Sequence, residues 1–436
     1  MLWRCLGRCL GATLGLVWSG LGAEPVDAAA EQILSAVVPG VASIEGKQTL
    51  LLLRHPISSL RAYVFRDGAP LPIAFQVDER DRRDRWVLDQ GKKPNVDTSA
   101  GEFDENDVLV ILNRDLGARG TLAQLPAGAT AWQEVRVGSV VAPLGFAYIG
   151  SFAQPPPLAC SDCAGARYEE ASDRVYAERY ALAFNAPLPT HLAFVKSRGE
   201  LGENRIAGVH AAAEVRFLGG LWTLKKTDAD IHAELLSYRN GPVRVMRRAR
   251  YWIPLPFGFR TSGRVDLLFY RDFVESSVLL KIGIPPSLIL ARGELQAYID
   301  FLRQDGARVF LEETAPSALI EGQPTQTGKP ASGRLAQWAA LLLPDGRAIL
   351  LLARLEGALQ RLEQRLFFDE RESTDDTPGR RPRFGFEFAR VDRLESGTHR
   401  LSVVAHILES TRTEDIRKAA QIFLHPPEVT AAALPQ

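Results

Sequence analysis

The chain has 436 residues, of which 46% are hydrophobic and 24% charged, and its 52 basic residues balance its 52 acidic ones. Basic and acidic residues are interspersed, which argues against nucleic acid as a partner. The length predicts two or three domains with enough apolar sequence for packed cores. Beyond the N-terminus, no apolar run reaches the roughly 18 residues that a membrane helix needs.

The first 23 residues are typical of a cleaved secretory signal. Arg4 and Arg8 precede an apolar run at 10–17, and small residues suited to signal peptidase follow at 19–23. Removal of this signal leaves 50 basic and 52 acidic residues. We therefore expect a periplasmic or extracellular protein that has no integral membrane segment once residues 1–23 are removed.

Residues 24–154 predict an N-terminal β-sandwich-like domain. Runs that are apolar, or that alternate between apolar and polar residues, are typical of strands. Such runs occur at 49–53, 59–65, 71–77, 108–112 and 134–140. Asp67-Gly68 is typical of a turn between two of them.

A linker rich in proline follows at 155–167 and contains Cys160 and Cys163. This CxxC spacing also occurs in redox motifs, in halves of zinc sites and, before a histidine, in haem attachment. Ala164 follows here, no second CxxC exists, and no thioredoxin-like βαβ pattern surrounds the pair. In an oxidising compartment we expect a disulfide between Cys160 and Cys163 that tightens the linker.

Residues 168–412 predict a larger domain that resembles a β-supersandwich, and residues 413–436 a C-terminal helix and tail. Long strands are expected at 231–238, 243–253 and 265–273, a hairpin at 337–343 and 347–355, and further strands at 384–388 and 399–407. Helical spacing is confined to 288–304, 358–366 and 415–423. The fold class is therefore mainly β, with antiparallel sheets stacked face to face and few short helices.

An acidic loop contains Asp104, Asn106 and Asp107. Carboxylate and amide oxygens spaced this closely could bind a structural Ca²⁺, although the EF-hand spacing and its glycine are missing. Asp and Asn also bond their own backbone in turns before strands, which explains the cluster without an ion. The nearby run at 78–86 alternates acids and arginines, as a solvated face or a protected sheet edge does. A loop that contacts a sugar or an anion is the other interpretation of this run.

The strands between 231 and 273 carry the candidate site. Alternation predicts that His232, Glu234 and Tyr238 share a face of the first strand. Matching faces of the next two strands carry arginine, tryptophan, tyrosine and aspartate, a mixture that suits the hydroxyls and acidic groups of sugars. The candidate catalytic residues are His232, Tyr238, Arg244 and Arg248, and the candidate binding residues are Glu234, Trp252, Tyr270 and Asp272. An ordinary water-exposed sheet face with cross-strand ion pairs would show the same pattern.

Two segments resemble carbohydrate-active proteins. Gly68 to Asp78, with Gln76 and Asp78, followed by Asp107 to Val110, resembles exported β-sandwich domains of polysaccharide lyases and glycoside hydrolases. Asn240 to Val245 is similar to a strand opening in supersandwich proteins of the galactose-mutarotase-like kind. The resemblance implies a β-sandwich fold, and a glycan is the expected partner of the candidate sheet face in an exported protein. It matches no set of lyase catalytic residues.

These observations favour an exported, carbohydrate-associated binding or structural protein with no cofactor other than a structural Ca²⁺. The alternative is a polysaccharide lyase or glycoside-active enzyme, with Tyr238 or His232 as base and Arg244 or Arg248 neutralising a uronate carboxylate. Motifs of zinc hydrolases, serine hydrolases and nucleotide-binding loops are missing from the sequence.

Overall fold

The computed structural model describes residues 39–138, 145–159, 165–185, 188–196, 199–217, 221–254, 260–282, 286, 290–302, 304, 306–311, 320–321, 333–372 and 380–434. All of them belong to one compact unit that begins at Val38. The signal predicted at 1–23 and the cysteines Cys160 and Cys163 lie outside the described residues. In the described ranges, no helix has the length and apolar character needed to span a membrane.

The N-terminal part contains two antiparallel sheets packed face to face. One sheet has the order β1-β5-β4, with β1 Val41–Glu45, β4 Gln76–Asp78 and β5 Val108–Leu112. The other has the order β27-β6-β7-β2-β3, with β2 Leu60–Arg66, β3 Ala69–Ile73, β6 Ala129–Gly138, β7 Gly145–Phe152 and β27 Glu428–Ala433. Val64, Val135 and Ile149 of the second sheet pack against Leu109 and Ile111 of the first.

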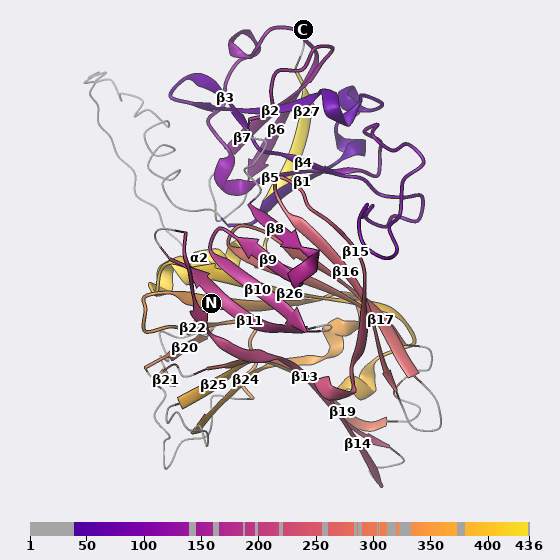
Figure 1. Cartoon of the computed structure of the whole chain (residues 1–436), viewed down its shortest axis with the longest axis vertical. Coiled ribbons are helices and arrows are strands. Elements are labelled where there is room, and N and C mark those ends of the chain that lie inside the picture. Colours follow the sequence, from indigo (N-terminus) through magenta and orange to yellow (C-terminus); the bar gives the residue numbers. More distant parts are fainter. Residues whose placement is uncertain are drawn as a thin grey trace, which may run out of the picture. The chain divides into compact units, whose positions relative to one another are not determined.

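The C-terminal strand β27 belongs to this N-terminal sandwich. Val429 lies opposite Val137 of β6, and Ala431 lies opposite Val135. In Figure 1 the yellow β27 accordingly lies among the purple strands of the N-terminal part. The segment predicted to be a tail therefore completes a sheet whose other strands come from residues 60–152.

The larger part of the protein is built around a nine-stranded antiparallel sheet. Its order is β15-β16-β17-β18-β26-β23-β22-β20-β21. The strands are β15 His232–Arg239, β16 Val245–Pro254, β17 Arg260–Phe269, β18 Phe273–Ile282, β20 Arg308–Leu311, β21 Ile320–Glu321, β22 Trp338–Leu342, β23 Ala348–Leu355 and β26 Gly397–Leu408.

Two five-stranded sheets cover one face of this nine-stranded sheet. The first is β12-β11-β10-β9-β8, with β8 Ala166–Glu169, β9 Arg174–Ala177, β10 Tyr180–Asn185, β11 Leu188–Val195 and β12 Leu201–Asn204. The second is β14-β13-β19-β25-β24, with β13 Ile206–Phe217, β14 Trp222–Thr227, β19 Leu290–Phe301, β24 Glu363–Glu372 and β25 Arg380–Ala389. Phe269 and Leu351 of the large sheet meet Tyr180, Phe384 and Phe386 of these two sheets in one buried core. The predicted class, mainly β with stacked antiparallel sheets, is confirmed.

We call the opposite side of the nine-stranded sheet the outer face. It is covered in part by β5 and in part by α2, the helix at Thr413–Leu424. Val110 of β5 and Ile416 of α2 join the same apolar cluster as Met246 and Leu352 of the sheet. Short 3₁₀ turns connect several strands: η1 Gly46–Gln48, η2 Leu50–Leu52, η3 Ile57–Ser59, η4 Asn113–Asp115, η5 Leu122–Gln124, η6 Glu170–Ser172, η8 Asp228–Asp230, η11 Gly357–Arg361 and η12 Val391–Arg393.

The structure corrects several local predictions. The single strand expected at 71–77 is divided between β3 and β4, which belong to different sheets, and the strand expected at 265–273 ends with β17 at Phe269. Residues 288–304 were expected to be helical, but β19 occupies Leu290–Phe301 as a strand between β13 and β25. Residues 358–366 form a 3₁₀ turn and the start of β24 instead of a helix. The strand expected at 49–53 is the turn η2. The helix expected at 415–423 and the hairpin around 344–346 are confirmed.

Candidate functional site

A register shift in β15 divides the predicted face. Leu235 lies opposite Ala249 of β16, but Ser237 lies opposite Arg248, so Leu236 is an extra residue in the ladder. The prediction that Tyr238 shares a face with His232 and Glu234 is therefore wrong, because one inserted residue reverses the alternation beyond it.

Tyr238 points away from the outer face. Its hydroxyl donates a hydrogen bond to Glu170 Oε2 at 3.1 Å, and its ring meets Tyr168 edge to face at 4.7 Å between centroids. Burial and the neighbouring Glu170 carboxylate raise the pKa of Tyr238. A phenol with a raised pKa that donates to a carboxylate is held in its neutral form.

His232, Glu234, Arg250 and Trp252 lie together on the outer face. The rings of His232 and Trp252 are stacked at 5.5 Å with an angle of 19° between their planes. Arg250 Nη2 donates to Glu234 Oε2 at 3.0 Å, and its guanidinium lies 5.8 Å from the Trp252 ring centre. These residues form an accessible group with an aromatic surface, a cation and an anion.

Arg248 is buried, and its guanidinium already donates hydrogen bonds to other groups of the protein. Its guanidinium forms two hydrogen bonds with Asp266 of β17, at 2.7 and 3.2 Å, and donates a third to the Trp86 carbonyl at 3.2 Å. Asp266 also forms an ion pair with Arg264, with 3.4 Å between Asp266 Oδ2 and Arg264 Nε. The side chain of Arg248 is only 7% exposed, so it orders the sheet and the loop that carries Trp86.

Arg244 joins the N-terminal sandwich to the nine-stranded sheet. Its guanidinium donates to Asp78 Oδ2 at 2.8 Å and to the Tyr270 hydroxyl at 2.6 Å. The side chains of Arg244 and Asp78 are 4% and 0% exposed. Burial alone would lower the pKa of Arg244, but Asp78 and Tyr270 raise it well above its usual range. Burial raises the pKa of Tyr270 to about 12.

Gln76 takes part in the same buried contact, which we call the joint and which consists of Gln76, Asp78, Arg244 and Tyr270. Its side-chain oxygen accepts hydrogen bonds from the backbone N–H groups of Val243 and Arg244 at 3.1 and 3.0 Å, and its amide donates to Asp78 at 2.6 Å. A Cβ at Gly241 would lie 2.1 Å from the Gln76 side-chain oxygen, so only glycine fits there. The two segments singled out by their resemblance to carbohydrate-active proteins thus bind each other.

Asp272 lies apart from this joint, next to His406 at 3.7 Å. Burial alone would raise its pKa, but the hydrogen bond and charge of His406 lower it. Of the eight predicted catalytic and binding residues, the structure brings His232, Glu234 and Trp252 to the exposed group, Arg244 and Tyr270 to the joint, and Tyr238 to the opposite face. It leaves Arg248 between β17 and the Trp86 loop, and Asp272 beside His406.

The acidic loop uses its oxygens on its own backbone. Asp107 accepts the N–H groups of Arg80 and Asp104, each at 3.0 Å, and Asp104 accepts the N–H of Asn106 at 3.1 Å. Burial raises the pKa of Asp107 to about 7 despite these two amides. Among the described residues, no three His, Cys, Asp or Glu side chains are arranged to hold a metal. A Ca²⁺ site here stays a prediction.

A cleft of about 630 Å³ lies where the N-terminal sandwich meets the outer face. It is lined by Ser43, Glu45, Lys47, Gln48, Arg80, Trp86 and Val108 on one side and by Arg244, Leu268, Glu275, Ser277, Arg354, Glu356, Arg400 and Ser402 on the other. Arg244 is the one of these that was a candidate catalytic or binding residue, and Arg80 and Trp86 belong to the run at 78–86 that had a sugar- or anion-contacting loop as one interpretation. The cleft brings together hydroxyl, carboxylate, ammonium and guanidinium groups from both sides.

The floor of the cleft consists of side chains on neighbouring strands. Ser277 of β18 lies opposite Ser402 of β26, which lies opposite Arg354 of β23. Arg354 Nη2 donates to Glu275 Oε1 at 2.9 Å, while its buried Nε–H has no protein acceptor. Arg400 is exposed and has no ion pair with a described residue. The floor therefore offers hydroxyls and guanidinium N–H groups that a ligand could use.

The opposite wall contains the Trp86 indole, with two guanidinium groups close to its ring. The Arg80 guanidinium lies 4.0 Å from the Trp86 ring centre, and that of Arg244 lies 5.2 Å from it. Such contacts hold an aromatic ring in one orientation. Arg80 also pairs with Asp84 at 2.8 Å and retains a buried Nε–H without an acceptor.

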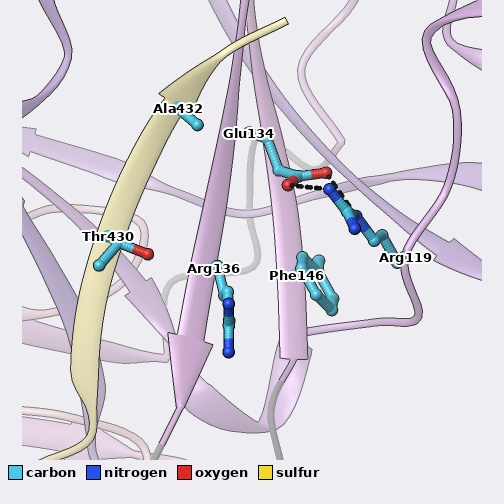
Figure 2. Close-up of a pocket in the computed structure, with 6 residues that line it drawn as sticks. All are labelled: Arg119, Glu134, Arg136, Phe146, Thr430 and Ala432. Atoms are coloured by element: carbon cyan, nitrogen blue, oxygen red, sulfur yellow. Dashed lines mark hydrogen bonds and ion pairs between the residues drawn. The ribbon is translucent and has the colours of Figure 1, made fainter.

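A smaller hollow of about 250 Å³ lies on the N-terminal sandwich (Figure 2). Glu134 at its rim is held by Arg119 at 3.1 Å and by the Tyr148 hydroxyl at 3.1 Å. Arg136, which lies between Phe146 and Thr430 on neighbouring strands, points into the hollow and has no ion pair among the described residues. The volume of this hollow suits a small chemical group better than an extended polymer.

Most cleft residues escaped sequence analysis. Glu275 and Ser277 belong to β18, which was not predicted, and Arg354 and Arg400 come from strands predicted only as structural elements. Alternation would have placed each of them on one face of its own strand. Only the order of strands in the sheet reveals that these faces coincide.

No protein-family model and no curated protein matches this sequence. Several solved structures share part of its topology. An alpha-mannosidase from Enterococcus faecalis V583 has 10% identity and a TM-score of 0.47, with 92% of this chain and 45% of that chain covered. An alpha-N-acetylgalactosaminidase from Bifidobacterium bifidum has 15% identity and a TM-score of 0.35, with 59% and 37% covered.

A heparan sulfate lyase from Pedobacter heparinus has 11% identity and a TM-score of 0.30, with 55% of this chain and 33% of that chain covered. This chain thus spans less than half the length of each of these three proteins. All three TM-scores lie below 0.5, so the chemistry of the site itself has to carry any functional conclusion.

Proposed function

We propose that this chain is an exported, carbohydrate-associated protein that binds a glycan in the cleft between the N-terminal sandwich and the nine-stranded sheet. The observation that carries the proposal is the set of side chains around the cleft of about 630 Å³. Ser277 and Ser402 supply hydroxyls, Arg354 and Arg400 supply guanidinium donors, and the Trp86 indole supplies a flat apolar surface. Sugar rings need this mixture of dense hydrogen-bonding groups beside an aromatic ring.

The composition of the cleft favours binding over eliminative chemistry. The lyase hypothesis assigns the removal of a proton from a sugar carbon to a tyrosine or histidine base. The described lining of the cleft contains neither residue type. The bases of the alternative hypothesis, His232 and Tyr238, lie on opposite faces of the sheet. Glu356, whose carboxylate has no ion pair in the described part of the chain, is suited to accept hydrogen bonds from sugar hydroxyls.

The test is direct binding of the purified protein to a broad glycan panel, followed by calorimetry with the glycans that bind. Replacing Arg354 by Ala removes a donor from the floor, and we expect at least a tenfold loss of affinity. Arg383→Ala is the matched control, because Arg383 is also a partly buried arginine paired with one acid, Asp300 at 3.2 Å, but does not line the cleft. Failure of the whole panel to bind, or equal affinities of the two variants, would refute the proposal.

A further inference from the structure

The geometry points to a linear acidic polysaccharide as the ligand, laid across the strands of the outer face from the cleft at Arg400, over Arg264, to the stacked rings of His232 and Trp252. This inference rests on the proposed glycan-binding function and adds the class of glycan and its path. The residues that carry it lie outside the cleft, apart from Arg400 and Glu356.

The path follows from the register of four neighbouring strands. Arg250 of β16 lies opposite Arg264 of β17, Arg264 opposite Leu279 of β18, and Leu279 opposite Arg400 of β26. Directly paired residues project from the same face of a sheet, so these three arginines form one row across the outer face. We call it the arginine row.

The spacing along the arginine row suits an extended chain. Strands in a sheet are about 4.8 Å apart, so Arg250 and Arg264 are about one strand spacing apart, and Arg264 and Arg400 about two. A compact anion such as phosphate could contact one or two of these guanidiniums. Only an elongated molecule with repeated acidic groups engages all of them.

The row holds positive charge that the carboxylates of the protein compensate only in part. Asp266 is shared between Arg248 at 2.7 Å and Arg264 at 3.4 Å, so one carboxylate faces two guanidiniums. Burial lowers the pKa of Arg264, and the charges of Arg248, Arg85 and Arg400 lower it further against the effect of Asp266. Mutual repulsion of this kind is relieved when an anion binds.

Carboxylates mark both ends of the row. Glu356 lines the cleft beside Arg400, and Glu234 binds Arg250 at 3.0 Å. Acids beside the cations suit sugar hydroxyls, which donate to carboxylates, but they repel a closely spaced phosphodiester backbone. The mixture therefore favours an acidic sugar chain over a nucleic acid.

Beyond Arg250 the row ends at an aromatic surface. His232 lies opposite Trp252, and their rings stack at 5.5 Å on the same outer face. A sugar ring can pack on such a surface, which would fix the far end of a bound chain. The cleft and the stacked rings are then two ends of one binding track.

The experiment compares full-length protein with polygalacturonate, heparan sulfate, neutral cello-oligosaccharides and single-stranded DNA at several salt concentrations. We expect an acidic polysaccharide to bind best, with an affinity that falls as salt is raised. Arg400→Gln and Arg264→Gln should each weaken that binding about fivefold to twentyfold. Arg361→Gln is the control, because Arg361 is an exposed arginine on η11 that is paired with Glu395 outside the row.

Chain length gives a second readout. Trp252→Ala should weaken binding of long acidic chains and leave short oligosaccharides, which occupy only the cleft, unaffected. Preferred binding of neutral sugars would overturn the acidic-chain inference but leave the proposed glycan binding intact. Stronger binding of DNA than of any acidic polysaccharide would also overturn the acidic-chain inference. Binding of acidic chains that is insensitive to Arg264→Gln and Arg400→Gln would overturn the path. Absence of any glycan binding would overturn both proposals.

Discussion

At the scale of single residues, Arg244 is a tightly constrained side chain. Its side chain is buried and charged. Its guanidinium donates hydrogen bonds to Asp78 and Tyr270, and its backbone N–H donates to the side-chain oxygen of Gln76. A buried ion pair is weak in net terms, but removing one partner leaves the other charge unpaired in a poorly solvated site. Arg244 was predicted to neutralise the carboxylate of a ligand, but in the structure its partner is the Asp78 carboxylate of the same chain.

Asp78→Ala should therefore lower the free energy of unfolding by about 3 to 5 kcal/mol. The measurement is urea unfolding followed by tryptophan fluorescence. Asp84→Ala removes an acid with a 70% exposed side chain that also pairs with an arginine, and it should cost less than about 1 kcal/mol. Similar losses in the two variants would contradict the buried character of the joint.

Asp107 gives a pH-dependent stability with a defined sign. Its pKa is raised by burial to about 7 in the folded protein, against an ordinary value of 3.8. Between these values the folded state binds more protons than the unfolded state, so stability falls as pH rises from about 4 to about 7. Asp107→Asn cannot titrate and should lack this decline.

The check is the difference in unfolding free energy between wild type and Asp107→Asn, measured from pH 4 to pH 8. We expect wild type to lose stability relative to the variant up to about pH 7 and the difference to level off above it. A difference that stays constant, or that moves in favour of wild type with rising pH, would mean that Asp107 is ionised throughout the range.

At the scale of elements, predictions failed where a tertiary partner overrode a local preference. Residues 290–301 contain Leu, Ala, Glu and Gln, which favour helices, yet β19 is a central strand flanked by β13 and β25. The extra residue Leu236 in β15 has no sequence signal, although it decides on which face Tyr238 lies. By contrast, Pro344-Asp345-Gly346 predicted its hairpin correctly, because Gly346 adopts a φ of +86° that favours glycine.

The element whose removal should be most informative is β27. Val429 and Ala431 pack against the core of the N-terminal sandwich, and the strand covers one edge of β6. Deleting residues 426–436 should lower the thermal midpoint and accelerate amide hydrogen exchange in β6, because its ladder partner is lost. Thr430→Ala is the control, since it keeps the strand and alters only a side chain at the smaller hollow. Unchanged exchange in β6 would contradict this role of β27.

At the scale of the whole molecule, the cleft exists because two sandwiches are held against each other. The joint of Gln76, Asp78 and Arg244 lies beside it, and β27 ties the C-terminal end to the N-terminal sheet. Contacts that bridge two substructures couple their unfolding. We therefore expect one cooperative thermal transition in the wild-type protein.

Gly241→Ala should separate this transition into two, because the added Cβ would lie 2.1 Å from the Gln76 side-chain oxygen and force the joint apart. Scanning calorimetry measures the outcome. Gly346→Ala is a fair comparison: it perturbs a surface turn at positive φ, where an added Cβ meets no atom within 4 Å, and should leave a single transition. Two transitions in the wild type, or one in Gly241→Ala, would contradict the coupling.

The sequence by itself determined the class of the fold and many of its strands, because alternation of apolar and polar residues is a local property that survives in the folded chain. It also identified Gln76, Asp78, Gly241 and Arg244 as members of two unusual segments. Only the tertiary structure decided that these segments bind each other. Strand order and register are long-range properties, so the cleft and the arginine row, which combine β16, β17, β18, β23 and β26, could not be derived from any single stretch of sequence.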